Sequence, residues 1–263
     1  MTLLMERILA ADGMRVVFQP ILDLSRPAPE LHALECLTRG AGDSSAAQPG
    51  VMFDYVRRKH MEPVVDRACI RASLRAAAAL PGDPCLSVNV HAATLGRDPE
   101  FPAFLAAAAQ QERIATPRLT IEIIEHGQYW DGVTFHDALA SIRDMGACIA
   151  LDDVGLGFSN LRMMLESRPD YLKIDRYFVS GAHADPRRTA VLRSVAELGD
   201  QLSARVIAEG IEEEAELEIL KGLGIELIQG YLFTKPIDAD GLIAGHWLDG
   251  SVRRAPRGRC TAA

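Results

Sequence analysis

Short apolar runs alternate with longer helical patterns through most of this chain. The runs that indicate buried strands cover residues 16–18, 31–37, 85–90, 119–124, 147–151, 171–174, 205–208 and 227–229. Amphipathic or alanine-rich stretches that indicate helices lie between them, at residues 64–80, 101–112, 133–145, 187–201 and 213–223. Strand–helix alternation is typical of a parallel sheet covered by helices. About eight such strands in a chain of this length predict an α/β fold, a closed TIM-like (β/α)8 barrel rather than an open sheet.

The size and composition of the chain suit one large domain. Its 263 residues are 48% hydrophobic and 24% charged, which allows a sizeable core. We expect a single domain over residues 1–250 and a disordered basic tail over residues 251–263, where several arginines accompany proline and glycine. The small-residue stretch 40–50 is expected to be a loop over the barrel mouth rather than a domain boundary.

Charge and cysteine content narrow the class of protein further. The formal net charge of −8 argues against binding to duplex nucleic acid, whose phosphates are held by clustered Lys and Arg. The five cysteines are odd in number and contain no C-x-x-C pair, and four of them lie in apolar stretches typical of free core cysteines. This usage fits a reducing cytoplasm. The sequence contains no apolar segment of the roughly twenty residues needed to span a bilayer.

Polar residues stand at the ends of the predicted strands. Asp152 and Asp153 end the buried run 147–151, and a glycine-rich turn follows them. Two adjacent carboxylates repel each other unless a cation, a proton or bulk water intervenes. Lys173, flanked by Leu and Ile, needs a carboxylate partner. Six more strand-end residues are Glu35, Asn89, Glu122, Asp175, Glu209 and Gln229.

In a barrel these strand ends meet at one mouth, where active sites lie. Taken singly, each residue also has an ordinary explanation as a turn residue or a solvated surface group. Taken together, so many converging carboxylates require cations, and their oxygen ligands suit Mg²⁺ or Mn²⁺ rather than zinc. The pair Asp152–Asp153 predicts one carboxylate between two ions and one on a single ion. Two such ions are typical of phosphodiester hydrolysis, in which Lys173 would orient or stabilise the attacking hydroxide.

Eight short motifs resemble the EAL domain, a family of bacterial phosphodiesterases that hydrolyse cyclic di-GMP. They occur in the family's order from about Phe18 to Pro236. The motifs are Phe18-Gln19-Pro20-Ile21, Glu35-Cys36-Leu37-Thr38-Arg39, Ser87-Val88-Asn89-Val90, Glu122-Ile123-Ile124-Glu125, the segment from Asp152 to Ser159, Lys173-Ile174-Asp175, Ala208-Glu209-Gly210-Ile211-Glu212 and Gln229-Gly230-Tyr231.

The resemblance implies a fold, a reaction and a set of roles. The fold is a modified TIM barrel whose first strand runs antiparallel to the rest, and the reaction opens cyclic di-GMP to linear pGpG with two Mg²⁺ or Mn²⁺ ions. Catalytic roles fall to Glu209 as a candidate general base, to Lys173 beside the attacking water and to Glu35. The implied metal ligands are Glu35, Asn89, Glu122, Asp152, Asp153, Glu209 and Gln229. The implied substrate contacts are Gln19, Leu37, Arg39, Asp175 and Tyr231.

The resemblance also implies a homodimer. Its contact is the loop over residues 153–160 with the neighbouring helix, and this loop couples dimerisation to metal binding. Glu125 and Glu212 match acidic residues that anchor the loop.

The chain departs from the family pattern in the signature and in this loop. The signature Glu-Ala-Leu reads Glu35-Cys36-Leu37, and Gly40 replaces the family's Trp. In and beneath the loop, Val154 replaces Phe, Asn160 replaces Ser and Ile124 replaces Thr. These changes leave the ligand set complete but predict weaker anchoring of the loop and altered contacts to the base. The alternative to an active phosphodiesterase is a degenerate EAL domain, which would bind the nucleotide or a protein without cleavage. A third alternative is another Mg²⁺-dependent barrel enzyme, which would not need Arg39 or Gln229.

Overall fold

Eight strands close into a barrel. The computed structural model describes residues 6, 8–10, 13–40, 48–124, 132–156, 160–245, 253–254 and 260. The barrel strands are β1 (Met14–Asp23), β2 (Glu30–Gly40), β3 (Leu86–His91), β4 (Leu119–Ile124), β5 (Cys148–Val154), β6 (Tyr171–Ile174), β7 (Arg205–Ala208) and β8 (Leu227–Ile228).

The order of the strands confirms the predicted barrel. Strands β2 to β8 follow one another in parallel around the sheet, and β1 closes the ring by pairing antiparallel with both β2 and β8. A two-residue strand β9 (Arg253–Arg254) adds to the outer edge of β2 in parallel, opposite Glu30 and Leu31. Part of the predicted tail is therefore paired with the sheet.

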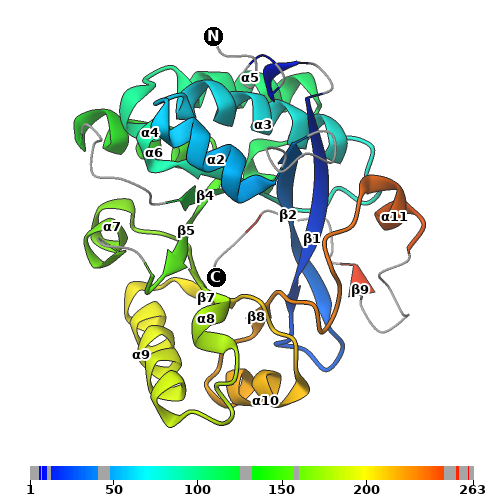
Figure 1. The fold of residues 1–263 in the computed structure, drawn as a ribbon, viewed down its shortest axis with the longest axis vertical. Helices are drawn as coiled ribbons and strands as arrows, with labels where there is room; N and C mark the ends of the chain where they lie inside the picture. Colours follow the sequence, from blue (N-terminus) through cyan, green and yellow to red (C-terminus); the bar gives the residue numbers. More distant parts are fainter. Residues whose placement is uncertain are drawn as a thin grey trace.

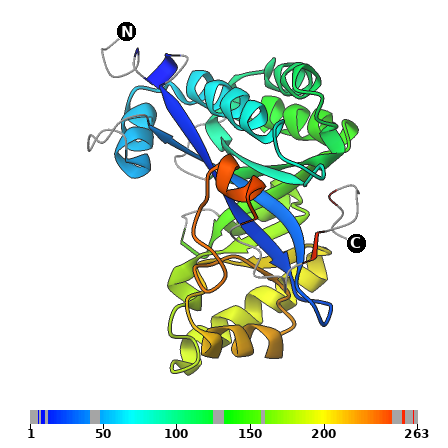
Figure 2. The same cartoon turned by 90° about the vertical axis from the view of Figure 1, so that its right-hand side faces the viewer.

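Helices cover the outside of the ring. The helices between residues 49 and 144 lie toward one end of the long axis and those between residues 176 and 222 toward the other, with the strands between them (Figures 1 and 2). Short helices such as α4, α7, α8 and α11 were not predicted. The helices are α2 (Pro49–Arg58), α3 (Glu62–Ala77), α4 (Ala92–Arg97), α5 (Phe101–Gln111), α6 (Gly132–Asp144), α7 (Asn160–Ser167), α8 (Arg176–Val179), α9 (Pro186–Leu202), α10 (Glu214–Gly222) and α11 (Ala239–Ile243), with a 3₁₀ turn at Thr116–Arg118.

Alternation along each strand divides the core into two shells. Outward-facing residues such as Val88, Ile121 and Leu172 pack against the helices in the larger apolar cluster. A smaller cluster fills the inside of the barrel with Ile21, Ala33, Cys148, Ala150, Tyr171, Ile207, Leu227 and Cys260. Most of these inner residues lie two positions before or after one of the polar residues named in the sequence analysis. Because side chains alternate along a strand, the two then point to the same face. This inner cluster therefore packs directly beneath the strand-end side chains. We call it the floor of the site.

The cysteines depart from the expected free state. Cys36, Cys69 and Cys148 are free and buried, whereas Cys85 and Cys260 form a disulfide. The pairing of Cys85 was not predicted, because its partner lies 175 residues away in the tail. Within the part of the chain that the structure describes, no helix is both long enough and apolar enough to span a bilayer.

Candidate active site

A buried lysine stands at the centre of the polar strand ends. Lys173 lies in β6, which is buried throughout, and only 1% of the residue is exposed. Its Nζ is 2.7 Å from Oε1 of Glu209 and 2.8 Å from Oε2 of Glu122. Oε2 of Glu35 and Oδ1 of Asp152 follow at 3.4 and 3.5 Å. The sequence thus correctly predicted that Lys173 needs carboxylate partners, and one ammonium contacts four of them.

Amide and hydroxyl groups hold the carboxylates in place. Asn89 donates through Nδ2 to Oε1 of Glu35 at 3.0 Å, and Gln229 donates through Nε2 to Oε2 of the same carboxylate at 2.6 Å. Gln229 also donates to Oε1 of Gln19 at 3.2 Å. Ser87, two residues before Asn89 on the same face of β3, donates to Glu122. The polar strand ends predicted from the sequence therefore meet in one network.

The two adjacent aspartates face the same site because the strand is irregular there. The pairing of β5 with β6 shifts register between Leu151 and Val154, and Asp153 has a φ of 52°. In a regular strand, neighbouring side chains point to opposite faces. The bulge and the left-handed residue cancel that alternation, at a backbone cost that Asp tolerates better than most residues. Oxygen atoms of Asp152, Asp153 and Glu209 consequently lie within 4.8 Å of one another.

Burial and crowding change the protonation of the carboxylates. Burial, reinforced by Glu35, raises the pKa of Glu122 to about 8 although Lys173 opposes the shift. Burial and the neighbouring Asp152 raise the pKa of Asp153 to about 6. Burial also raises the pKa of Glu209 well above its ordinary value. In the metal-free chain Glu122 therefore keeps its proton at neutral pH, whereas Asp153 keeps its proton only up to about pH 6.

Two groups in the cluster keep their charge. Burial favours the neutral amine of Lys173, but the carboxylates around it raise its pKa well above the ordinary value. Burial would likewise raise the pKa of Glu35, yet Lys173 and the amides of Gln229 and Asn89 bring it below its usual range. Lys173 is therefore a permanent ammonium and Glu35 a permanent carboxylate in this network.

The donor set fits a hard divalent cation. Oδ1 of Asp152 and Oε1 of Gln229 are buried and make no hydrogen bond within the described part of the protein. Buried polar atoms usually have a partner. Oδ1 of Asp152 has only its 3.5 Å ion pair with Lys173, so both atoms keep the capacity to bind a cation. Carboxylate and amide oxygens are the ligands that Mg²⁺ and Mn²⁺ prefer. Because a single ammonium cannot neutralise four carboxylates, additional positive charge would stabilise the cluster.

Two cavities, each of about 230 Å³, open on either side of the cluster. Both are lined by Glu35, Leu37 and Asp152. The first continues along Arg39 toward α2 and α3. The second contains most of the substrate contacts that the resemblance implies, namely Gln19, Leu37, Asp175 and Tyr231. The predicted metal ligands and substrate contacts are therefore contiguous around one mouth of the barrel.

The loop-anchoring residues are the part of the prediction that the structure does not bring to the cluster. Glu125 and residues 157–159 of the loop lie outside the described residues. The Glu212 carboxylate pairs with Arg176 of α8 at 3.3 Å, and its side chain is 46% exposed. Anchoring of the loop by Glu125 and Glu212 stays a prediction.

Sequence reasoning missed a buried network beside the first cavity. Asp66 of α3 accepts hydrogen bonds from the backbone N–H of His91, from the His91 ring and from Thr94. The three residues join α3 to the end of β3 just beyond Asn89. An aspartate between apolar positions of a predicted helix was the available signal. Ser87 was also missed, although its strand parity with Asn89 placed it inside the barrel.

The fold and the site together define an α/β-barrel protein whose acidic cluster suits divalent cations. The sequence profile described as the EAL domain matches residues 4–236, and the chain belongs to the EAL domain family. Among its relatives is the cyclic di-GMP phosphodiesterase NbdA of Pseudomonas aeruginosa, which is 28% identical over 89% of this chain and 30% of NbdA.

Solved structures agree with this assignment. The EAL enzyme Bd1971, in a form with cAMP and cyclic di-GMP bound, is 27% identical with a TM-score of 0.81 and covers 91% of this chain and 66% of its own. BlrP1 of Klebsiella pneumoniae, in a complex with calcium and cyclic di-GMP, is 25% identical with a TM-score of 0.74, over 86% of this chain and 57% of its own. The chain spans between a fifth and two fifths of the length of the curated relatives it matches.

Proposed function

We propose that this chain hydrolyses cyclic di-GMP to linear pGpG with two Mg²⁺ or Mn²⁺ ions. The observation that carries the proposal is the contact of Lys173 with four carboxylates at the mouth of an EAL-type barrel. The name of NbdA and the cyclic di-GMP bound to Bd1971 support the choice of substrate. The complete set of polar strand ends favours an enzyme over a receptor that binds without cleavage.

The shape of the site agrees with a long, anionic substrate. The two cavities meet at Glu35, Leu37 and Asp152, so a ligand that fills both lies across the carboxylate cluster. A cyclic dinucleotide has two bases on opposite sides of a phosphate ring, and its reacting phosphodiester would then lie over the cluster. Arg39 in the first cavity is suited to a phosphate oxygen.

Each residue of the cluster has a role that follows from its charge. Glu209 would be a carboxylate once cations are bound, and its Oε1 lies 2.7 Å from Nζ of Lys173, so it is suited to accept a proton from the attacking water. Lys173 stays protonated, so it orients the nucleophile and stabilises negative charge rather than acting as a base.

The remaining polar residues would hold the ions. Bound divalent ions would supply a water of lowered pKa and a clamp on the phosphate oxygens. The residues that would hold them are Glu35, Asn89, Glu122, Asp152, Asp153, Glu209 and Gln229.

Chromatography of cyclic di-GMP incubated with the purified chain tests the proposal. With Mg²⁺ or Mn²⁺ we expect pGpG, and with a chelator we expect none. Glu209→Gln should lower turnover by about 10²–10⁴-fold, because it removes the base. Glu218→Gln, on the exposed face of α10, is the matched control and should leave turnover unchanged. Binding of the intact nucleotide without cleavage in the presence of metal would instead make the chain a receptor.

We also propose that two copies pair through the loop over residues 153–160 and helix α7. Leu156 at the start of the loop is 50% exposed, and Leu161 and Leu165 of α7 are each 70% exposed. Leu161 and Leu165 are four residues apart, so both lie on one face of the helix. Exposed apolar side chains on one face of a helix are typical of a contact surface. We also propose a cytoplasmic setting, which the cysteine usage of the sequence predicts.

A further inference from the structure

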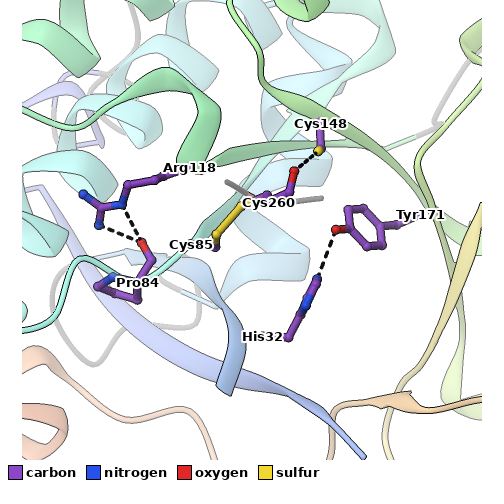
Figure 3. The surroundings of a disulfide bond; sticks show 7 residues. All are labelled: His32, Pro84, Cys85, Arg118, Cys148, Tyr171 and Cys260. Atoms are coloured by element: carbon purple, nitrogen blue, oxygen red, sulfur yellow. Dashed lines mark hydrogen bonds between the residues drawn. A yellow bond between two sulfur atoms is a disulfide. The ribbon is translucent and has the colours of Figure 1, made fainter. Parts of the chain in front are cut away.

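Cys260 lies inside the barrel, at the end opposite the candidate active site. Only 5% of Cys260 is exposed, and the residue packs in the inner apolar cluster with Ala150 and Tyr171. Its N–H donates to the carbonyl of Pro117 at 3.0 Å, and its carbonyl accepts from the Cys148 thiol at 2.8 Å. Cys260 therefore fills the inside of the barrel at the amino ends of the strands, close to Cys148 (Figure 3).

A covalent bond holds Cys260 in this position. Cys260 is joined to Cys85, the residue directly before β3, and the two cysteines are 175 residues apart in sequence. The turn that carries Cys85 is itself held, because Arg118 donates through Nε and Nη2 to the Pro84 carbonyl at 3.1 and 2.7 Å (Figure 3). Backbone hydrogen bonds therefore hold Cys260 itself and Pro84, the residue before Cys85.

The third cysteine of this group is a hydrogen-bond donor, not a competitor for the disulfide. Burial raises the pKa of Cys148 to about 12, and the nearby Asp170 adds to the rise. A thiol attacks a disulfide only as the thiolate, so Cys148 remains protonated and inactive in exchange. Reduction must come from outside the barrel.

A cavity of about 730 Å³ gives an external thiol a route to the bond. Cys148 and Cys260 line its inner end, and the exposed Asp200 and Glu226 line its rim. It lies at the amino ends of the strands, away from the two cavities beside Lys173. Cys260 is buried and Cys85 is partly exposed, and this cavity gives a small dithiol access to Cys260.

We propose that Cys85–Cys260 is a thiol–disulfide exchange site that fastens or releases the tail beneath the barrel. A dithiol thiolate attacks one sulfur to give a mixed disulfide, and its second thiol then displaces the chain. The dithiol is oxidised to its disulfide as Cys85 and Cys260 become thiols, so two electrons and two protons pass to the protein. Afterwards only the hydrogen bonds of Cys260 and the short β9 pairing hold the described part of the tail.

Release of the tail loosens the floor of the site. Tyr171, which packs with Cys260, stands two residues before Lys173 on the same face of β6, and its hydroxyl lies 3.1 Å from Nε2 of His32. Ala150 stands in the same relation to Asp152. Loss of Cys260 would leave both floor residues without a packing partner from below.

Thiol mapping and melting of the full chain, with dithiothreitol as the dithiol, test the proposal. Oxidised protein should yield a peptide that links Cys85 to Cys260, while Cys36, Cys69 and Cys148 resist alkylation. After reduction, Cys85 and Cys260 should both be alkylated without denaturant, and the melting temperature should fall by roughly 5–10 °C. These readouts need no substrate, so they stand even if the chain does not cleave cyclic di-GMP.

Two variants separate this site from the other cysteines. Cys85→Ser/Cys260→Ser should melt where reduced wild-type protein melts and should not respond to dithiothreitol, whereas Cys69→Ala should keep the full response. A linked peptide that contains Cys148, or reduction that leaves both alkylation and melting temperature unchanged, would overturn the proposal. If the double variant does not fold, the response of the wild-type chain still decides.

Discussion

At the scale of single residues, Lys173 is the most consequential side chain of the protein. A buried ammonium is tolerated only when partners offset the loss of hydration, and here four carboxylates do so. The dependence is mutual, because the carboxylates would otherwise repel one another inside the barrel. Lys173 therefore contributes to the stability of the fold as well as to the chemistry proposed for the site.

Replacement of Lys173 separates these two contributions. Lys173→Met keeps most of the length of the side chain but removes the charge, so metal-free protein should lose about 3–5 kcal/mol of unfolding free energy in urea. Mn²⁺ should restore part of that loss, because cations can compensate the carboxylates. Turnover should stay absent even with metal. Lys221→Met, which breaks an exposed pair with Glu218, is the control and should cost less than about 1 kcal/mol. Equal losses in the two variants would contradict this reading.

At the scale of elements, the alternation of side chains along each strand predicted most of the site. Local irregularities in the strands account for the rest. Strands β4, β6 and β7 match their predicted bounds, and alternation correctly turned Lys173 inward. Alternation alone would have separated Asp152 from Asp153, because no sequence rule located the bulge between them. The pairing of β1 with β2 also shifts register, between Ile21 and Leu22, and His32 is the extra residue of β2 there. The ring of His32 contacts Tyr171 inside the barrel. The short helices were missed because fewer than three turns show little periodicity.

The turns that follow the site strands are as constrained as the strands. Gly210, directly after Glu209, has a φ of 67°, and a Cβ there would lie 2.3 Å from the Cβ of Arg176. Gly181 has a similar φ of 71°, but a Cβ there would have no atom within 4 Å. The two glycines share their backbone strain and differ only in crowding.

Replacing each of the two glycines by alanine measures the cost of the contact with Arg176 separately from the cost of the positive φ. Gly181→Ala should cost about 1 kcal/mol, the usual penalty of a left-handed non-glycine residue. Gly210→Ala should cost roughly 2 kcal/mol more, because Arg176 must move. It should also lower the proposed turnover at least tenfold by displacing Glu209, while Gly181→Ala leaves turnover near wild type. Urea unfolding and the cyclic di-GMP assay measure both effects, and indistinguishable variants would refute the steric argument.

At the scale of the whole molecule, folding, protonation and metal binding are linked. The pKa of Glu122 is raised from 4.5 to about 8 and that of Asp153 from 3.8 to about 6. The folded chain therefore binds more protons than the unfolded chain across this range, so these groups make metal-free protein less stable as pH rises toward about 8. The lowered pKa of Glu35 acts in the opposite sense only below its ordinary value of 4.5.

Divalent ions should reverse this trend. Ligands bind metal as carboxylates, so the rise in melting temperature caused by Mn²⁺ should be larger at about pH 8 than at about pH 6. Calorimetry in buffers of different ionisation enthalpy should detect proton release on binding. Glu122→Gln removes the carboxyl group whose pKa is raised to about 8, so it should flatten the metal-free pH dependence between about pH 6 and 8. A Mn²⁺ effect that is independent of pH would argue against protonated ligands.

The proposed pairing of two copies also belongs to this scale. Leu161→Glu/Leu165→Glu places two carboxylates on the exposed face of α7, and it should convert a dimer to a monomer in sedimentation. Val191→Glu, on the exposed face of α9, should not change the oligomeric state. If the wild-type chain sediments as a monomer at all concentrations, the pairing does not occur.

The antiparallel strand β1 closes the barrel, because it pairs with both β2 and β8. It is made early in synthesis, yet its partner β8 is among the last strands to leave the ribosome. Until β8 emerges, the sheet has two open edges, and β1 can pair only with β2. Gln229, which holds Glu35, comes one residue after β8, so the step that seals the ring also completes the site. Contacts between distant segments form slowly. A nascent chain therefore gains its full set of polar strand ends only when the ring closes, and no fragment that ends before Gln229 carries them all.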